Sequence, residues 1–102
     1  MKDYFVYILK CSDDSYYTGI TNNLEKRINE HNSGMIKGYT SKRLPVVLLY
    51  SQRFDDINRA IEVEKQIKGW SRRKKKALIA GDFELLIELS NNKRERRQSS
   101  IP

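Results

Sequence analysis

Residues 5–21 have the sequence FVYILKCSDDSYYTGIT, in which two runs of aromatic and β-branched residues flank the polar segment 12–15. This pattern predicts two antiparallel strands joined by a tight turn. In such a hairpin we expect Tyr7 and Tyr17 to face one another across the strand pair, with both hydroxyls directed toward one site. A buried tyrosine commonly does no more than pack and find a hydrogen-bond partner, so the hairpin alone leaves the role of this pair open.

The length and composition of the chain restrict its class. A chain of 102 residues, 38% of them hydrophobic, is large enough for one domain with a single core. No apolar run approaches the roughly 20 residues that a membrane helix needs, so the chain is not expected to be a membrane protein. The first strand follows Met1 so closely that a signal peptide has no room, and the single Cys11 excludes an internal disulfide. The chain is therefore expected in the cytoplasm.

The net charge of +7 and the isoelectric point near 9.6 predict an anionic partner. Nucleic acid is favoured over a membrane surface, because the predicted helices turn their apolar faces toward the core. One histidine and one cysteine exclude a zinc site made of the usual His and Cys ligands. A metal would depend on carboxylates, waters and substrate oxygens, which suits Mg²⁺ or Mn²⁺.

A first helix is predicted over residues 24–31, with Asn22 or Asn23 as its N-cap. The spacing i, i+3, i+4, i+7 defines the stripe that should face the core, and two of its four members are Arg27 and His31. An ordinary explanation is that Arg27 extends to solvent and His31 stabilises the end of the helix. The helix alone does not decide between this ordinary explanation and a functional role for the two residues.

The segment 35–44 is predicted to be a basic loop. It contains Lys37, Lys42 and Arg43 close to the aromatic ring of Tyr39. Cationic segments that contain an aromatic residue can lie on a phosphate backbone. The same composition also fits an ordinary solvated loop.

A near-continuous apolar run at residues 45–50 predicts a third strand, buried on both faces and placed at the centre of the sheet. The helix that follows begins with Asp55 and Asp56 at its positive end and ends at Gly69. Glu64 interrupts the apolar stripe of this helix. Glutamate is almost never buried without a partner, so this position calls for an explanation.

Ser71 is predicted to cap a further helix, 72–80, that begins with a basic run and ends at Gly81. A basic helix start opposes the macrodipole, and contact with phosphates would offset that cost. A short amphipathic segment, 83–89, completes the predicted single domain 1–89, and the basic residues 90–102 are expected to form a disordered tail. The basic residues predicted to contact nucleic acid are Lys37, Lys42, Arg43, Lys68, Arg72, Arg73, Lys74 and Lys75.

Three charged residues thus occupy stripes that should be apolar: Arg27, His31 and Glu64. One small core has no stability reason to bury all three, so we expect them to share a site with the strand tyrosines. A carboxylate for a hard cation, an arginine for a phosphate, and a tyrosine or histidine that takes a proton from water are the parts of metal-assisted phosphodiester hydrolysis.

These residues resemble a known family. Val6-Tyr7, Tyr17-Thr18-Gly19, Arg27, His31 and Glu64 together are similar to the motifs of the GIY-YIG nucleases. The resemblance covers roughly residues 3–81 and is strongest to the small stand-alone bacterial members; it extends to the N-terminal catalytic module of the repair nuclease UvrC. It implies an α+β fold, with a three-stranded antiparallel sheet flanked by helices, and metal-dependent endonuclease activity on DNA.

The resemblance also implies roles for individual residues. Tyr7 corresponds to the first family tyrosine, the general base or water-positioning group, and Tyr17 corresponds to the second. Arg27 would bind the scissile phosphate, and His31 would assist proton transfer or hold the tyrosine. Glu64 would ligate Mg²⁺ or Mn²⁺. Gly19 corresponds to the motif glycine, at which the strand must approach the site without a side chain.

The sequence departs from the family pattern in both strand motifs. Phe5-Val6-Tyr7 stands where the name-giving pattern has Gly-Ile-Tyr, and Thr18 replaces the usual isoleucine of the second motif. Larger members carry a second DNA-binding domain for targeting, which leaves three expectations open for this chain: weak cleavage, action on a particular DNA structure, or dependence on a partner protein, with DNA repair or recombination as the implied role. Three alternatives stay open: RNA as the substrate, a non-catalytic nucleic-acid-binding module on the same fold, and an interaction subunit that completes its site only in a complex.

Overall fold

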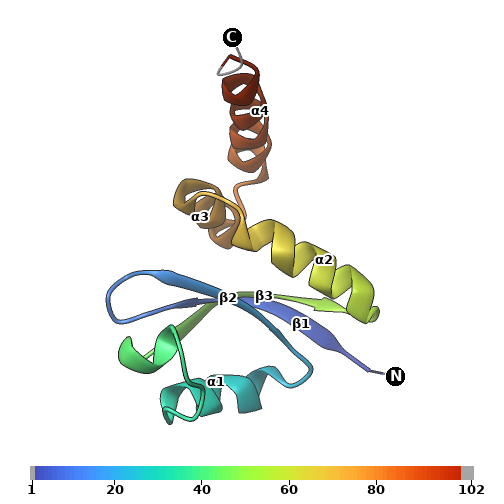
Figure 1. Ribbon diagram of the computed structural model, residues 1–102. Coiled ribbons are helices and arrows are strands. Elements are labelled where there is room, and N and C mark those ends of the chain that lie inside the picture. Colours follow the sequence, from blue (N-terminus) through green and yellow to red (C-terminus); the bar gives the residue numbers. More distant parts are fainter. Residues whose placement is uncertain (1, 100–102) are drawn as a thin grey trace. The chain divides into compact units, whose positions relative to one another are not determined.

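The computed structural model describes residues 2–99, with side chains as far as Asn91 (Figure 1). The elements are, in chain order, β1 (Tyr4–Lys10), β2 (Tyr16–Thr21), α1 (Leu24–Asn32), the 3₁₀ turn η1 (Thr40–Lys42), β3 (Val47–Phe54), α2 (Ile57–Lys68), α3 (Arg72–Ala80) and α4 (Phe83–Ser99). The three strands form one antiparallel sheet. The predicted α+β class and the predicted three-stranded sheet are therefore confirmed.

The sheet has the strand order β2-β1-β3, so that β1 lies at its centre. The prediction that the third strand is central was wrong. The segment Val6 to Leu9 of β1 is completely buried, as expected for a strand covered on both faces. Among residues 2–99, the third strand, β3, pairs only with β1, and its first residue, Val47, is 53% exposed. An apolar run fits an edge strand of a small sheet as well as a central one, because most of its side chains can still reach a core.

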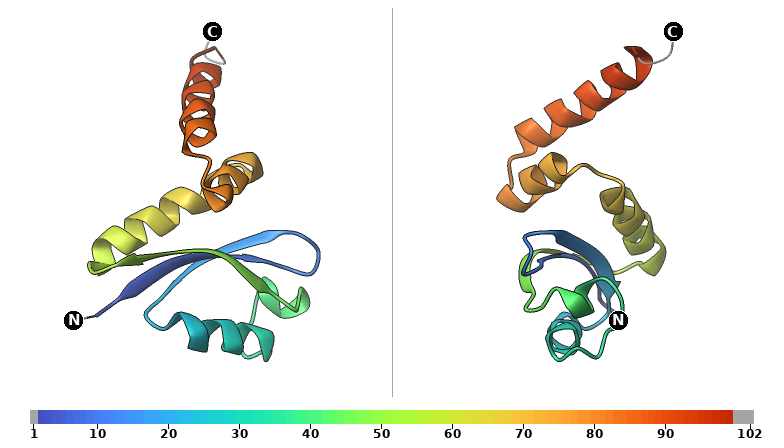
Figure 2. Two further views of the ribbon diagram at one scale, coloured as in Figure 1. Left: turned by 180° about the vertical axis from the view of Figure 1, so that it is seen from behind. Right: turned by 60° about the vertical axis from the view of Figure 1, so that its left-hand side comes forward.

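Side chains of β1 alternate between the two faces of the sheet. Tyr7 and Leu9 belong to a core cluster that packs against Leu24 and Ile28 of α1. Val6 and Ile8 therefore point to the opposite face, and α2 contacts all three strands. Figures 1 and 2 show α1 and α2 on opposite sides of the sheet.

Two of these helix starts have the cap that the sequence predicts, and the third is capped by one of the two acids predicted at its positive end. The side chain of Asn23, not that of Asn22, accepts a hydrogen bond from the backbone N–H of the third helical residue at the start of α1. Asp56 caps α2 and Ser71 caps α3 in the same way, each through a side-chain oxygen. Gly81 ends α3 with a left-handed backbone, φ 72°, which favours glycine.

The chain forms two compact units, one that ends at Gly69 and one that begins at Trp70. The second unit contains α3 and α4, which contact each other. The predicted segment 83–89 is the first part of α4, which starts at the Asp82 cap and continues to Ser99 through most of the predicted tail. Residues 100–102 of that tail lie outside the described residues. Over the described part of the chain, no helix is long and apolar enough to cross a membrane.

Candidate active site

A chain of hydrogen bonds links three buried polar side chains on the α1 side of the sheet. The Tyr7 hydroxyl lies 3.1 Å from Nε2 of His31, and Nδ1 of the same imidazole lies 2.8 Å from Oγ1 of Thr40. Tyr7 and His31 are 0% exposed and Thr40 is 1% exposed. The three side chains come from β1, α1 and η1, so the chain joins elements far apart in the sequence. A buried polar side chain that retains partners on both sides is held in one orientation.

Gly19 makes the close approach of β2 to Tyr7 possible. The register places Gly19 directly opposite Tyr7, and a Cβ atom at Gly19 would lie 2.5 Å from the Tyr7 ring carbon Cζ and 2.5 Å from its hydroxyl. Contacts this short are not tolerated, so only glycine fits at this position. The role predicted for Gly19, a strand position without a side chain beside the site, therefore has a direct structural cause.

Tyr17 lies on the same face as Tyr7 but not directly opposite it. The register pairs Tyr17 with Leu9, so the expected face-to-face pairing of the tyrosines is wrong by two residues. The two rings meet diagonally, with centroids 6.4 Å apart. Diagonal neighbours on one face remain within reach of aromatic side chains. Tyr17 also meets the His31 ring in an edge-to-face contact at 5.3 Å.

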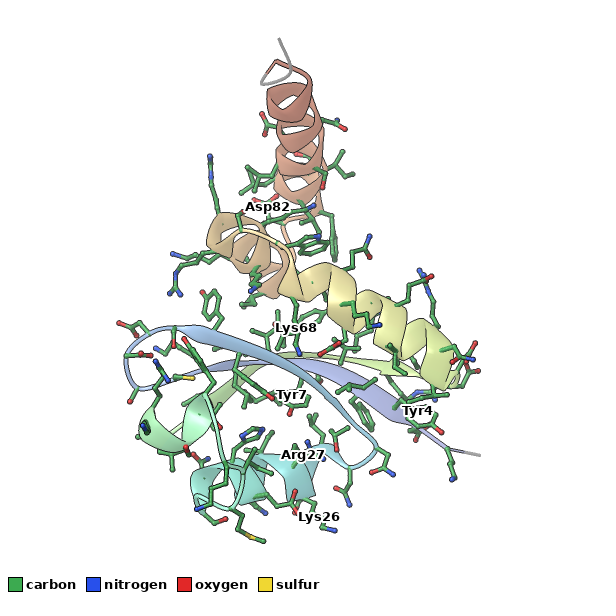
Figure 3. All side chains as sticks on the ribbon, viewed as in Figure 1. Tyr4, Tyr7, Lys26, Arg27, Lys68 and Asp82 are labelled. Carbon is green, nitrogen blue, oxygen red and sulfur yellow. The ribbon has the colours of Figure 1, made fainter. Side chains whose placement is uncertain are left out.

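Arg27 precedes His31 by one turn of α1, and Figure 3 shows it close to Tyr7, between the sheet and the helix. Its Nε lies 3.4 Å from a carboxylate oxygen of Glu30. That Nε is also buried and has no hydrogen-bond partner within the described part of the chain. A guanidinium has five N–H donors, so Arg27 can donate to an anionic oxygen of a ligand through its other N–H groups.

Glu64 lies on the buried side of α2 and is only 8% exposed. Its carboxylate forms an ion pair with Lys68, at 2.7 Å, one turn later on the same helix. The hydrogen bond to Glu64 is the main reason why the pKa of the Lys68 ammonium is raised. Figure 3 shows Lys68 between α2 and the sheet. Lys68, predicted to contact nucleic acid, is thus held on a buried carboxylate.

Burial raises the pKa of the Tyr7 hydroxyl to about 12, and the neighbouring Tyr17 adds to the rise. The Arg27 guanidinium opposes it through its charge and through a hydrogen bond to the Tyr7 side chain, whereas the Glu64 carboxylate raises this pKa further. These influences mean that Arg27, from α1, and Glu64, from α2, both lie within electrostatic range of one phenol. Tyr7 is protonated at neutral pH.

Burial lowers the pKa of the His31 imidazole from its ordinary value. The nearby Arg27 charge lowers it further, and the Glu30 carboxylate partly opposes the change. His31 is therefore neutral at pH 7 and retains one ring nitrogen as an acceptor. A neutral imidazole in contact with a protonated phenol can receive the phenolic proton.

The carboxylate of Glu64 is the best candidate for a metal ligand. Within the described residues there is no group of three His, Cys, Asp or Glu side chains that could enclose an ion. Glu64 already attracts a cationic group, the Lys68 ammonium, to its oxygen. A site with one carboxylate and open positions fits Mg²⁺ or Mn²⁺, which retain waters and bind substrate oxygens. It does not fit a closed structural zinc site.

Arg43 holds the loop around the site in place. Its guanidinium donates hydrogen bonds to the Asp13 carboxylate, at 3.0 Å, and to the Tyr39 carbonyl, at 2.7 Å. It also lies 3.9 Å from the centroid of the Tyr39 ring, which stacks on Tyr17 with centroids 6.3 Å apart. Arg43 thus makes three contacts inside the protein, and its contact with phosphate stays a prediction.

The other predicted nucleic-acid contacts differ in their exposure. Lys37, Lys42, Arg72 and Arg73 are exposed. Lys75 is half-buried, and burial lowers the pKa of its ammonium, with a smaller contribution from Arg72. Lys74 is 8% exposed, and its Nζ lies 4.3 Å from the centroid of the Trp70 ring. A cation over an indole face stabilises the second unit, so Lys74 has a structural contact of its own.

The sequence analysis did not identify Thr40. It assigned the whole segment 35–44 to a basic loop, and no periodicity marks a single buried residue in such a loop. The buried hydroxyl is recognisable only from the fold, which brings η1 beside α1.

Comparison with known proteins places this geometry in a family. Residues 3–77 match the family model of the GIY-YIG catalytic domain. A UPF0213 protein of Natronomonas pharaonis is 44% identical over 80 residues, which are 78% of this chain and 94% of that protein. A UPF0213 protein of Staphylococcus saprophyticus is 45% identical over 80 residues, 78% of this chain and 98% of that protein.

Two solution NMR structures have a similar fold. One is a UPF0213 protein from Bacillus halodurans, 40% identical, with a TM-score of 0.52 over 76% of this chain and 83% of that one. The other is a protein from E. faecalis, 34% identical, with a TM-score of 0.57 over 83% of this chain and 90% of that one.

Proposed function

Because the chain belongs to the GIY-YIG family, we propose that it is a divalent-metal-dependent endonuclease that hydrolyses phosphodiester bonds in DNA. The observation that carries the proposal is the hydrogen bond of 3.1 Å between the buried Tyr7 hydroxyl and Nε2 of His31. A phenol is too weak a base to activate water unless its own proton has an acceptor, and the neutral imidazole supplies one.

In this proposal each site residue has one task. Tyr7 takes a proton from the attacking water while its own proton passes to Nε2 of His31. The Arg27 guanidinium, one turn before His31 on α1 and on a side chain that is 36% exposed, binds a non-bridging oxygen of the scissile phosphate. Tyr17 packs against both Tyr7 and His31 and keeps their rings in place.

Glu64 would hold Mg²⁺ or Mn²⁺ together with waters and phosphate oxygens. When bound, such an ion supplies charge stabilisation at the phosphate and the leaving oxygen. Lys68 must release the Glu64 carboxylate for this, and an ammonium group on a flexible side chain can do so without a backbone change. A role in DNA repair or recombination, guided by a partner protein, belongs to the same proposal.

The test is cleavage of plasmid, branched and single-stranded DNA, and of RNA, by purified protein with Mg²⁺ or Mn²⁺. Glu64→Gln keeps the shape of the side chain and removes its charge, and it should lower the cleavage rate at least about 100-fold. The matched control is Glu62→Gln on the same helix, because Glu62 is exposed and pairs with Arg59. Equal cleavage by wild type and Glu64→Gln contradicts the assignment.

The second candidate is a non-catalytic nucleic-acid-binding module. The Glu64–Lys68 ion pair favours it, since the carboxylate is already neutralised without a metal. The net charge of +7 supports binding to a phosphate backbone. This candidate predicts salt-dependent binding that Glu64→Gln leaves unchanged, with no cleavage in the presence of either metal.

A further inference from the structure

We propose that Thr40 is a positioning residue that fixes the tautomer of His31, so that Nε2 stays free to accept the proton of Tyr7. The proposal rests on the proposed function for its catalytic meaning, but its structural part is testable without any reaction. Thr40 touches no substrate in this proposal and acts only through His31.

The argument starts from the geometry around the imidazole. Nδ1 lies 2.8 Å from Oγ1 of Thr40 and Nε2 lies 3.1 Å from the hydroxyl oxygen of Tyr7. A neutral imidazole has one N–H donor and one acceptor nitrogen. The partner of one nitrogen therefore determines what the other nitrogen can do.

The bond between the Tyr7 hydroxyl and His31 determines which atoms donate and which accept in the series of hydrogen bonds from Tyr7 through His31 to Thr40. A phenol O–H is a stronger hydrogen-bond donor than an imidazole N–H, and a neutral imidazole nitrogen is a stronger acceptor than a phenol oxygen, so Tyr7 donates to His31. The phenolic hydrogen then needs an acceptor of its own, and Nε2 of His31 is the acceptor nitrogen within hydrogen-bond distance. The single imidazole hydrogen is thereby assigned to Nδ1, and Nδ1–H donates to Oγ1 of Thr40.

The opposite tautomer is the one that Thr40 must disfavour. A hydrogen on Nε2 would point at the phenol oxygen and leave the phenolic hydrogen without the imidazole as acceptor. In that state His31 could not take the phenolic proton. A hydroxyl that accepts from Nδ1–H stabilises the useful tautomer, as the third group does in a nucleophile–base–orienter arrangement.

The position of Thr40 suits this task. Its side chain is 1% exposed, so water does not compete for Nδ1. Its backbone is held by η1, where the carbonyl of Thr40 accepts from the N–H of Arg43 at 2.9 Å. Thr18 gives a contrast, since it is also buried, at 4% exposure, but its Oγ1 has no hydrogen-bond partner within the part of the chain that the structure describes. A buried hydroxyl is therefore not bonded to an imidazole by default in this fold.

The test uses the fact that the chain has a single histidine. Nitrogen NMR of tag-free, ¹⁵N-labelled protein at pH 7.5, without metal or DNA, shows which ring nitrogen carries the hydrogen. Wild type and Thr40→Ser should show the Nδ1–H tautomer. Thr40→Val keeps the shape and removes the acceptor, and it should shift the population toward Nε2–H. Thr18→Val is the matched control and should leave the tautomer unchanged.

Three results overturn the proposal: an Nε2–H tautomer in wild type, a Thr40→Val spectrum equal to that of wild type, or a Thr18→Val effect as large as that of Thr40→Val. If Thr40→Val does not fold, the spectra of wild type and Thr40→Ser still test the proposal, because both proteins must show the Nδ1–H tautomer and an Nε2–H tautomer in either contradicts it. Cleavage adds a second measurement, in which Thr40→Val should slow the reaction about 10-fold or more while Thr40→Ser retains most of the rate.

The two proposals fail separately. If wild type cleaves no nucleic acid but the spectra behave as expected, the endonuclease function is wrong and the positioning by Thr40 stands as a structural property. If wild type cleaves DNA and Thr40→Val changes neither tautomer nor rate, the positioning role is wrong and the endonuclease function stands.

Discussion

The two faces of the central sheet bury polar groups in different ways. On the α1 side, the hydroxyl of Tyr7, the imidazole of His31 and the hydroxyl of Thr40 form a continuous hydrogen-bonded chain. On the α2 side, β1 contributes Val6 and Ile8, which are completely buried and apolar. Thr18 of β2 lies between Tyr17 and Gly19 in sequence and therefore points to this second face.

The difference indicates what each face is specialised for. Each buried polar group without a hydrogen-bond partner lowers the stability of the protein by about 1–3 kcal/mol. Three such groups in one small core therefore need positions at which all of them can form hydrogen bonds. The α1 face has this geometry, and we infer that it is constrained by the positions of hydrogen-bonding atoms. On the α2 side the strands contribute Val6, Ile8 and Thr18, whose Oγ1 has no hydrogen-bond partner among the described residues, so these strand positions are constrained mainly by volume. The buried polar pair on that side, Glu64 and Lys68, belongs to α2 itself.

The largest effect is expected for Gly19→Ala on the α1 face. A methyl group there would lie 2.5 Å from the Tyr7 ring, and both residues belong to paired strands that cannot easily separate. We expect a loss of about 3 kcal/mol in the free energy of unfolding, measured with urea. The control is Gly69→Ala, where the nearest atom would be at 3.6 Å, with a change of no more than about 0.5 kcal/mol. A small loss for Gly19→Ala would mean that the Tyr7 ring can move aside, and the α1 face would not be rigid.

The second prediction concerns the loop that brings Thr40 to the α1 face. Arg43→Lys keeps the charge but loses the planar group that contacts Asp13, the Tyr39 carbonyl and the Tyr39 ring. We expect a loss of about 1–2 kcal/mol in unfolding free energy. Lys42→Ala, at the exposed neighbouring position, is the control and should change stability by less than about 0.5 kcal/mol. If Arg43→Lys keeps full stability but weakens DNA binding, Arg43 contacts phosphate, as the sequence predicted.

The sequence predicted the hairpin and the helix caps because these depend on local chemistry. Arg27, His31 and Glu64 were found because each interrupts an apolar stripe, and a stripe is a periodic signal. The strand order was not predictable from the apolar run of β3, because a run of that kind fits both a central and an edge strand. Pairing between strands depends on contacts distant in the sequence.

Two further features were not visible in the sequence for the same reason. Thr40 lies in a loop, where no periodicity separates a buried residue from an exposed one. Lys74 lies in a basic run, and only the nearby Trp70 ring distinguishes it from its exposed neighbours Arg72 and Arg73. Local patterns therefore found the residues that deviate from their surroundings and missed those whose surroundings come from the tertiary fold.

The third prediction uses pH to separate the two faces. The pKa of His31 is lower in the folded protein than its ordinary value, so the unfolded chain binds more protons as the pH falls toward and below that value. Stability should therefore be full at pH 7.5 and decrease at pH 5.5. His31→Gln should abolish most of this slope in urea titrations, whereas Thr18→Val on the other face should retain it. An unchanged slope in His31→Gln would mean that carboxylates, not the imidazole, cause the loss.

The smallest effect has the opposite sign and belongs to the α2 face. Thr18→Val replaces a buried hydroxyl, without a hydrogen-bond partner in the described part of the chain, by a methyl group of nearly the same shape, and it should raise the free energy of unfolding by up to about 1 kcal/mol. The same change at Thr40 removes the partner of a buried imidazole nitrogen and should lower it by about 1–3 kcal/mol. If both substitutions change stability in the same direction, hydrogen bonding constrains the buried threonines of the two faces equally. The proposed difference between the two faces is then wrong.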